Sequence, residues 1–294
     1  MPQFVTLFAS LLALVCSVTT TNAPLVADEP AGDAAVLSKT RGAMILHSSF
    51  DGVVDLNLFD ENGSMYTAAS TKRENSQRGT HGEVTIAKDQ GKFGDALQFR
   101  RKTEQVVFYQ GSESGYQQKD WQGTVSIWMK LNPDEDLEPG FCDPILITQR
   151  GWDDGAFFVD FDKELPRDFR LGVFPDYKTW NPSDTGFNQI PVDQRPMVTV
   201  NQPPFSADRW THVCYTWQNV NASDDGPGTA KLYLNGELQG TLRRPMRFTW
   251  DPKQVGIMIG VHYVGLMDDL IIFNRALDDQ QIKLLYRHPT GGLR

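Results

Sequence analysis

The stretch AKLYLNGELQG, residues 230–240, decides the fold class. Apolar and polar side chains alternate on both sides of Asn235-Gly236, and this alternation is typical of a half-buried β-strand. An Asn-Gly pair favours the type I′ turn, whose twist matches that of two paired antiparallel strands. The stretch therefore predicts a β-hairpin with Asn235 and Gly236 at its tip.

Short β-type runs separated by turn residues extend outward from this hairpin, from Met44 to Tyr286. No long segment with helical periodicity lies between them, so we predict an all-β fold rather than alternating strands and helices. The run Leu270–Phe273 is apolar on both faces, which indicates a central strand between two layers. The clearer runs are 44–50, 105–110, 124–131, 144–149, 156–161, 169–174, 210–217, 230–235, 255–260 and 266–273.

One helix is predicted, close to the C-terminal end of the chain. Asp278 suits its N-cap, Gln281 suits the reciprocal capping position, and residues 282–286 carry an apolar face. The helix is expected to end before Pro289. Residues 175–208 are rich in Pro, Asn, Asp and Gln and are predicted to form a long loop, a kind of segment that is often functional or mobile.

Composition excludes several classes of protein. The 294 residues allow one large domain or two small ones. Hydrophobic residues make up 40% and charged residues 22%, which permits a packed core and excludes wholesale disorder. The formal net charge is −9, from 28 Lys and Arg against 37 Asp and Glu. This balance argues against a surface that follows phosphates, so no nucleic acid partner is expected.

The N-terminal residues predict export. Residues 1–27 contain no charged side chain, and the apolar run 4–18 is too short to span a bilayer. The alternatives are an uncleaved N-terminal anchor and a lipoprotein acylated at Cys16, which the residues before Cys16 match poorly. No other stretch is long and apolar enough for a membrane span, so the mature chain is expected to be secreted, periplasmic or on the cell surface. The expected organisation is a signal peptide at 1–27, a linker at 28–42, one domain at 43–288 and a tail at 289–294.

Two cysteines, Cys142 and Cys214, remain after cleavage of such a leader. An oxidising compartment permits a disulfide between them. The alternative is a buried free thiol that behaves as a small hydrophobe, since Cys214 lies inside a strand pattern.

Five segments, in order, carry a resemblance that covers residues 43–287. They are QGKFGDALQF (90–99), TVSIWMK (124–130), WTHV (210–213), KLYLNGE (231–237) and GLMDDLIIFNRAL (265–277). Together they resemble the laminin-G-like branch of the concanavalin A-like lectin/glucanase superfamily. The resemblance implies a jelly-roll sandwich of two antiparallel sheets with one short C-terminal helix. That superfamily includes lectins, protein-binding modules and glucanases, so the fold does not decide the function.

Aromatic residues outside the strands are candidates for sugar binding. The C–H face of a sugar packs on an aromatic ring, while its hydroxyl groups need polar partners. The turn regions that offer both kinds of group hold Trp152, Asp153, Asp154, Tyr177, Trp180 and Asn181. The alternative role of each ring is to close the edge of the sandwich.

A carboxylate series at Asp160, Asp162 and Glu164 is the candidate for catalysis. It is similar to the Glu-x-Asp-x-(x)-Glu strand of laminarinase-type glucanases, whose carboxylates face one side and act as nucleophile and acid/base. Here Asp replaces the first Glu, Lys163 replaces an apolar residue, and Glu164 runs into a turn. The alternative is a polar strand end on a solvated face.

Calcium is the candidate cofactor. The resemblance implies an ion between the first and last strands, where the matching acidic residues are Asp51, Asp268 and Asp269. Hard cations take several oxygen ligands, including carboxylates. The alternative is that Asp268 and Asp269 bind backbone groups of a neighbouring loop.

The leading prediction is a secreted, non-catalytic module that recognises a glycan or an extracellular partner protein, with calcium as an optional aid. A glycoside hydrolase or polysaccharide lyase of the same fold is the second reading, and a structural or adhesive surface component is the third.

Overall fold

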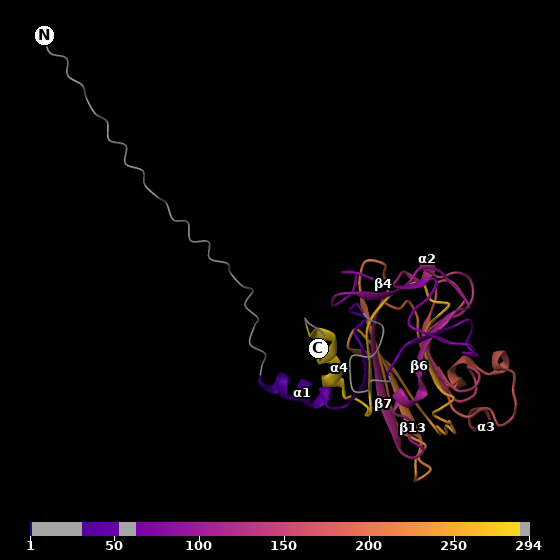
Figure 1. Cartoon of the computed structure of the whole chain (residues 1–294). Helices are drawn as coiled ribbons and strands as arrows, with labels where there is room; N and C mark the ends of the chain where they lie inside the picture. Colours follow the sequence, from indigo (N-terminus) through magenta and orange to yellow (C-terminus); the bar gives the residue numbers. More distant parts are fainter. Residues whose placement is uncertain (2–30, 53–62, 289–294) are drawn as a thin grey trace.

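The computed structural model describes residue 1, residues 31–52 and residues 63–288. In these ranges two antiparallel sheets face each other (Figure 1), which confirms the predicted jelly-roll sandwich. The first sheet has the order β14-β13-β12-β7-β16-β5-β4, and β1 also pairs with β16. The second sheet has the order β11-β10-β9-β8-β15-β6-β2-β3.

Each of the ten predicted runs coincides with a strand, and the structure adds several strands that those runs did not include. The first sheet contains β1 (Met44–Ser48), β4 (Val84–Ala87), β5 (Ala96–Phe99), β7 (Trp121–Lys130), β12 (Thr211–Val220), β13 (Gly228–Leu234), β14 (Glu237–Arg244) and β16 (Gly265–Phe273). The second contains β2 (Tyr66–Ala68), β3 (Gln77–Arg78), β6 (Val106–Gln110), β8 (Cys142–Thr148), β9 (Ala156–Phe161), β10 (Phe169–Phe174), β11 (Met197–Val200) and β15 (Gly256–Val261).

The main core lies between the two sheets. Leu270 and Ile272 of β16 point into it, whereas Ile271 and Phe273 belong to a separate cluster on the outer face. This strand is therefore buried on both sides, as its sequence predicted. Burial on this scale is the main source of folding free energy, at roughly 25 cal/mol per Å² of apolar surface.

The predicted hairpin is confirmed. Asn235 and Gly236 link β13 to β14 with φ angles of 52° and 79°. Two successive positive φ angles define the type I′ turn, and they explain why Asn and Gly occupy these positions.

The C-terminal helix is confirmed as α4 (Asp279–Arg287) with a complete capping box between Asp278 and Gln281. The backbone N–H of Gln281 donates to Asp278 Oδ1 over 2.9 Å, and the N–H of Asp278 donates to Gln281 Oε1 over 3.1 Å. Ile282 and Leu285 are buried in the outer cluster of the first sheet. Among the described residues, no helix is both long and apolar enough to cross a membrane.

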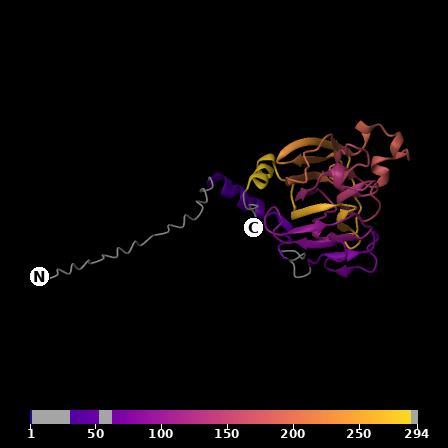
Figure 2. The ribbon, with the colours of Figure 1, turned by 90° about the horizontal axis from the view of Figure 1, so that it is seen from above.

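A second helix corrects the expectation of a linker at 28–42. Residues Ala31–Arg41 form α1, which lies beside α4 in both ribbon views (Figures 1 and 2). Leu37 is buried with α4 in the outer cluster, and Gln281 Nε2 donates to Thr40 Oγ1 over 2.8 Å. The sequence of α1 has no clear amphipathic pattern, so the pattern alone does not predict a helix here. Packing against α4 stabilises the helix instead.

The segment 175–208 also differs from the predicted loop. It contains α3 (Tyr177–Trp180), two 3₁₀ turns at Phe187–Gln189 and Val192–Gln194, and the edge strand β11. The remaining helical segments are α2 (Pro133–Asp136) and a 3₁₀ turn at Gly111–Ser114. In both ribbon views α3 lies on the side of the sandwich away from α1.

Candidate functional site

The outer face of the second sheet carries an aromatic end and a charged end. Side chains on one strand alternate between faces, so every second residue of β9 and its partner on β10 share this outer face. The outward pairs, in register, are Ala156 with Phe174, Phe158 with Gly172, and Asp160 with Arg170. Phe158 and Phe174 belong to an apolar cluster that is separate from the core between the sheets.

Trp152 is the exposed ring at the aromatic end, with 45% of its surface accessible. It meets Phe174 and Phe187 edge-on, with ring centroids 5.4 Å and 5.2 Å away. Trp180 also meets Phe174 edge-on, at 5.0 Å, and its indole N–H donates to the carbonyl of Asp153 over 2.8 Å. The hydrogen bond holds Trp180 partly buried, so Trp152 is the ring that presents a face to solvent.

Polar groups fix the backbone around this ring. Asp154 Oδ1 accepts a hydrogen bond from the N–H of Tyr177 over 2.9 Å, and Asp154 also pairs with Arg150 at 2.9 Å. Tyr177 donates its hydroxyl proton to Asp184 over 2.7 Å and accepts from Asn181 Nδ2 over 3.0 Å. The hydrogen bond to Asp184 raises the pKa of Tyr177 above its ordinary value.

The structure thus brings together all six residues predicted to bind a ligand. Trp152, Asp153 and Asp154 come from the β8–β9 turn, and Tyr177, Trp180 and Asn181 from the segment that follows β10. The two segments meet because β9 and β10 pair, and the N–H of Gly155 donates to the carbonyl of Pro175 over 3.1 Å. Asn181 is buried and holds the backbone of Thr185, so its role is to shape the loop.

Sequence reasoning missed three residues that complete this aromatic end. Phe174 belongs to an apolar strand run, which looked like core. Phe187 and Arg195 come from the segment without periodicity, and the Arg195 guanidinium lies 4.4 Å from the centre of the Phe187 ring. This cation–ring contact joins only Arg195 and Phe187, and it depends on tertiary structure.

The charged end does not gather the three carboxylates of the catalytic alternative. Asp160 is buried and forms a two-pronged ion pair with Arg170, whose Nε lies 2.9 Å from Oδ1 and whose Nη2 contacts Oδ2. Asp162 Oδ2 lies 3.8 Å from Arg170 Nη1. Glu164 lies beyond the end of β9, is exposed, and contacts Lys163. The three side chains therefore do not line one strand face.

Asp143 on β8 has an unusual environment for a carboxyl group. Burial, and then the charge of Asp160, raise the pKa of Asp143 to about 8, although Arg170 opposes the shift. Burial also raises the pKa of Asp160 above its ordinary value, against the effect of Arg170. Near neutral pH the coupled Asp143–Asp160 pair therefore holds a proton that two separate, solvated carboxylates would have lost.

The acidic residues predicted for calcium have other partners. Asp51 Oδ1 accepts from the N–H of Asp95 over 2.9 Å, and Asp268 Oδ2 accepts from the N–H of Phe93 over 2.8 Å. Asp269 Oδ1 instead lies 2.8 Å from Nε2 of buried His47. Two of the three carboxylates thus meet at one loop, but the described residues include no group of three His, Cys, Asp or Glu that could hold a metal ion. On their own these residues do not complete a calcium site.

Cys142 and Cys214 are both buried free thiols. Cys142 lies in the core between the sheets, whereas Cys214 lies in the outer cluster that contacts α4. Burial raises the pKa of both thiols above the ordinary value. The disulfide considered from the sequence is therefore absent between these two positions.

Comparison with known proteins identifies the fold. A family model described as the concanavalin A-like lectin/glucanases superfamily matches residues 117–283. No curated protein matches. The receptor binding domain of botulinum neurotoxin C/D mosaic serotype is 13% identical with a TM-score of 0.53, over 84% of this chain and 51% of that one.

Two further solved structures are similar to this chain. The binding domain of Paraclostridial Mosquitocidal Protein 1 is 12% identical with a TM-score of 0.50, over 84% of this chain and 52% of that one. Domain 4 of AbnA, an extracellular GH43 arabinanase from Geobacillus stearothermophilus in complex with arabinotriose, is 21% identical with a TM-score of 0.44. That match covers 83% of this chain and 98% of that one. The chain spans about half the length of the two toxin binding domains.

Proposed function

The chain belongs to the concanavalin A-like lectin/glucanases superfamily, because the family model matches more than half of its residues, and from this premise we propose that it is a secreted, non-catalytic module that binds carbohydrate through Trp152. The export part of this proposal rests on residues 1–27, of which residues 2–27 lie outside the described part of the chain. A partner protein that binds the same face is the alternative ligand.

The observation that carries the proposal is the exposed ring of Trp152, supported edge-on by Phe174 and Phe187. A ring fixed before binding loses little conformational entropy when a sugar packs on it. Arg150 and Asp154 lie beside it on the same turn, and such groups supply the hydrogen bonds that sugar hydroxyls need. A binding role also agrees with the receptor binding domain of the botulinum neurotoxin, which has this fold.

The test is a glycan-array screen of the purified chain, with and without calcium, followed by calorimetric titration of the best glycan. Trp152→Ala should weaken binding at least about tenfold, equivalent to about 1.4 kcal/mol. Leu238→Ala is the matched control, because Leu238 is 46% exposed but lies on β14 of the other sheet. Equal affinity of the unmodified protein, Trp152→Ala and Leu238→Ala for the glycan would reject Trp152 as the binding residue. An array on which no glycan binds would favour a protein ligand.

One observation favours a second function, glycoside hydrolysis or polysaccharide lysis. Asp143 has a pKa of about 8, and it lies beside the Asp160–Arg170 pair on the same sheet face. Raised carboxyl pKa values are common at catalytic sites. The array hits should be incubated with the protein and assayed for new reducing ends and for unsaturated products. Turnover that Asp143→Asn abolishes would replace the binding proposal by an enzymatic one.

Calcium assistance is also proposed, at Asp51 and Asp268, because both carboxylates contact the same loop at Phe93–Asp95. The described residues add no third His, Cys, Asp or Glu to this pair, so the remaining oxygen ligands would be backbone carbonyls, neutral side chains or water. Calcium added to metal-stripped protein should raise the melting temperature, since a ligand that binds only the folded state stabilises it. An unchanged melting temperature at millimolar calcium would reject the site.

A further inference from the structure

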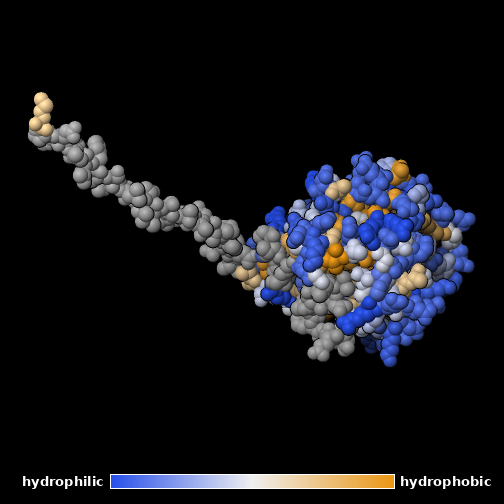
Figure 3. Space-filling model, turned by 45° about the horizontal axis from the view of Figure 1, so that its top comes forward, coloured by the Kyte–Doolittle hydropathy of each residue, from blue (hydrophilic) through white to orange (hydrophobic). Residues whose placement is uncertain are grey.

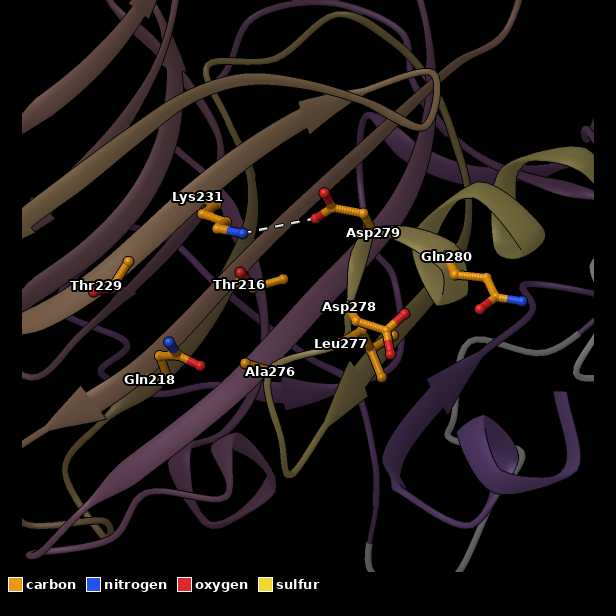
Figure 4. A pocket seen from close by; sticks show the side chains of 9 residues that line it. All are labelled: Thr216, Gln218, Thr229, Lys231, Ala276, Leu277, Asp278, Asp279 and Gln280. Carbon is orange, nitrogen blue, oxygen red and sulfur yellow. Dashed lines mark ion pairs between the residues drawn. The ribbon is translucent and has the colours of Figure 1, made fainter. Parts of the chain in front are cut away.

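A hollow of about 500 Å³ lies on the outer face of the first sheet, beside the start of α4 (Figure 4). It is separate from the Trp152 region, which lies on the second sheet. Its floor comes from β12 and β13, and its wall comes from residues 276–280, which lead into the first turn of α4. Its volume is within the range of about 300–1,000 Å³ that is typical of small-molecule sites.

Four polar side chains form the floor of this hollow. In the β12–β13 pair, Thr216 stands opposite Lys231 and Gln218 stands opposite Thr229. Residues two apart on a strand share a face, so the four side chains make a two-by-two polar patch. Farther along the same face, Cys214 and Tyr233 are buried in the outer cluster with residues of α4. The sheet face is thus apolar where α4 covers it and polar where the hollow leaves it open.

Most of these polar groups have no partner of their own. The side chains of Thr216, Gln218 and Thr229 make no hydrogen bond within residues 31–52 and 63–288. Lys231 Nζ lies 3.6 Å from Asp279 Oδ1. Figure 4 shows this ion pair across the hollow. The hollow is therefore lined by hydroxyl, amide, ammonium and carboxylate groups, and Leu277 adds an apolar wall.

The charge of the lining selects among classes of ligand. The only cation, Lys231, already faces Asp279, and the hydroxyl of Tyr233 donates to the same carboxylate over 2.7 Å. The carboxylate of Asp278 caps the helix. No unbalanced cation is left in this lining to hold an anion. Mixed donors and acceptors instead match hydroxyl groups, because each hydroxyl both donates and accepts.

We propose that this hollow is a second binding site, for a neutral hydroxyl-rich ligand of the saccharide or polyol class, and that it acts independently of Trp152. The two sites lie on outer faces of opposite sheets, so one molecule can hold two sugar units that point in different directions. A polymer or a glycan-covered surface would then bind with avidity beyond either single affinity.

The proposal is tested by titrating the isotope-labelled full chain with maltose and with myo-inositol while its backbone amide resonances are recorded. Amides of residues 216–218, 229–231 and 276–280 should shift and saturate. The double variant Thr229→Val/Gln218→Leu should weaken this binding at least tenfold, whereas Trp152→Ala should leave it unchanged. Glucosamine and glucuronate, which carry a charge, should bind more weakly than maltose.

The matched control is Thr85→Val/Gln98→Leu, because Thr85 and Gln98 form the same kind of cross-strand pair on β4 and β5 of the same sheet. It should bind both probes like the unmodified protein, and thermal melts show whether each variant folds. The proposal is overturned if neither probe gives saturable shifts at these amides in the folded, unmodified protein. It is also overturned if the Thr229→Val/Gln218→Leu variant binds the probes as well as the Thr85→Val/Gln98→Leu variant does. Loss of sugar binding only in Trp152→Ala would support the proposed function and refute the second site.

Discussion

Replacing Gly172 by Ala tests whether the outer face of the second sheet is packed as described. A Cβ atom at Gly172 would lie 2.1 Å from Cζ of Phe158 and 2.5 Å from both of its Cε atoms. Carbon atoms in good contact lie about 3.5–4.0 Å apart, so the ring would have to move by about 1.5 Å. Phe158 has little room for this, because it is buried and stacks on Phe174 with ring centroids 5.4 Å apart.

The expected loss of stability is that of an overpacked core, about 1–3 kcal/mol. In a domain of this size each kcal/mol lowers the melting temperature by about 2–4 °C, so a loss of about 2 kcal/mol gives about 4–8 °C. Because Phe174 also supports Trp152, sugar affinity should fall together with stability. Thermal unfolding followed by circular dichroism measures the first effect, and calorimetric titration measures the second.

Gly186→Ala is the control, since a Cβ there would meet only the Gln189 side chain at an ordinary 3.6 Å. Its melting temperature should stay close to that of the unmodified protein. Phe158→Leu, combined with Gly172→Ala, should cost less than the sum of the two single changes, because the smaller side chain relieves the clash. A Gly172→Ala protein that melts within about 1 °C of the original, or additive effects in the double variant, would refute this account of the packing.

Three further predictions concern pH, capping and redox state. The pKa of Asp143 is raised to about 8 from an ordinary 3.8. Proton binding at Asp143 therefore makes its full contribution to the free energy of unfolding below about pH 4, and this contribution is lost as the pH rises to 8. Asp143→Asn should therefore raise the melting temperature at pH 9 and change it little at pH 4; an equal effect at both would contradict the assignment. Asp278→Ala removes the N-cap of α4 and should cost about 1 kcal/mol in urea unfolding, whereas an unchanged midpoint would mean that the capping box contributes nothing. A reducing agent should leave the melting temperature unchanged, because Cys142 and Cys214 are free thiols, and a fall would reveal a bridge.

Local signals in the sequence were enough for the elements that depend on local physics. The type I′ turn at Asn235-Gly236 and the capping box of α4 follow from the preferences of a few adjacent residues, and both are confirmed. The helix α1 was missed, since its burial depends on Leu37 and Thr40 meeting α4 more than 200 positions away. Short strands such as β11 were missed because their pairing, rather than their pattern, makes them strands.

The candidate site likewise contains residues that the local sequence predicts and others, such as Asp143, that it does not. The six residues predicted to bind a ligand, Trp152 among them, come from two short segments joined by neighbouring strands, so sequence proximity and one hairpin register place them together. Asp143 was not found, because its environment depends on Asp160 and Arg170 and on a register shift between Cys142 and Ile145. Nothing adjacent to Asp143 in the sequence signals a carboxyl group that keeps its proton.

The docking of α1 against α4 also fixes where Ala31, the first residue of this helix, lies on the molecule. In Figures 1 and 2 this helix emerges on the side away from α3. An affinity tag, a fluorescent fusion or a chip linkage placed ahead of Ala31 would therefore stand clear of the Trp152 face. Immobilised through that end, the domain would present its aromatic surface to the bulk solution, as sensor and array measurements require.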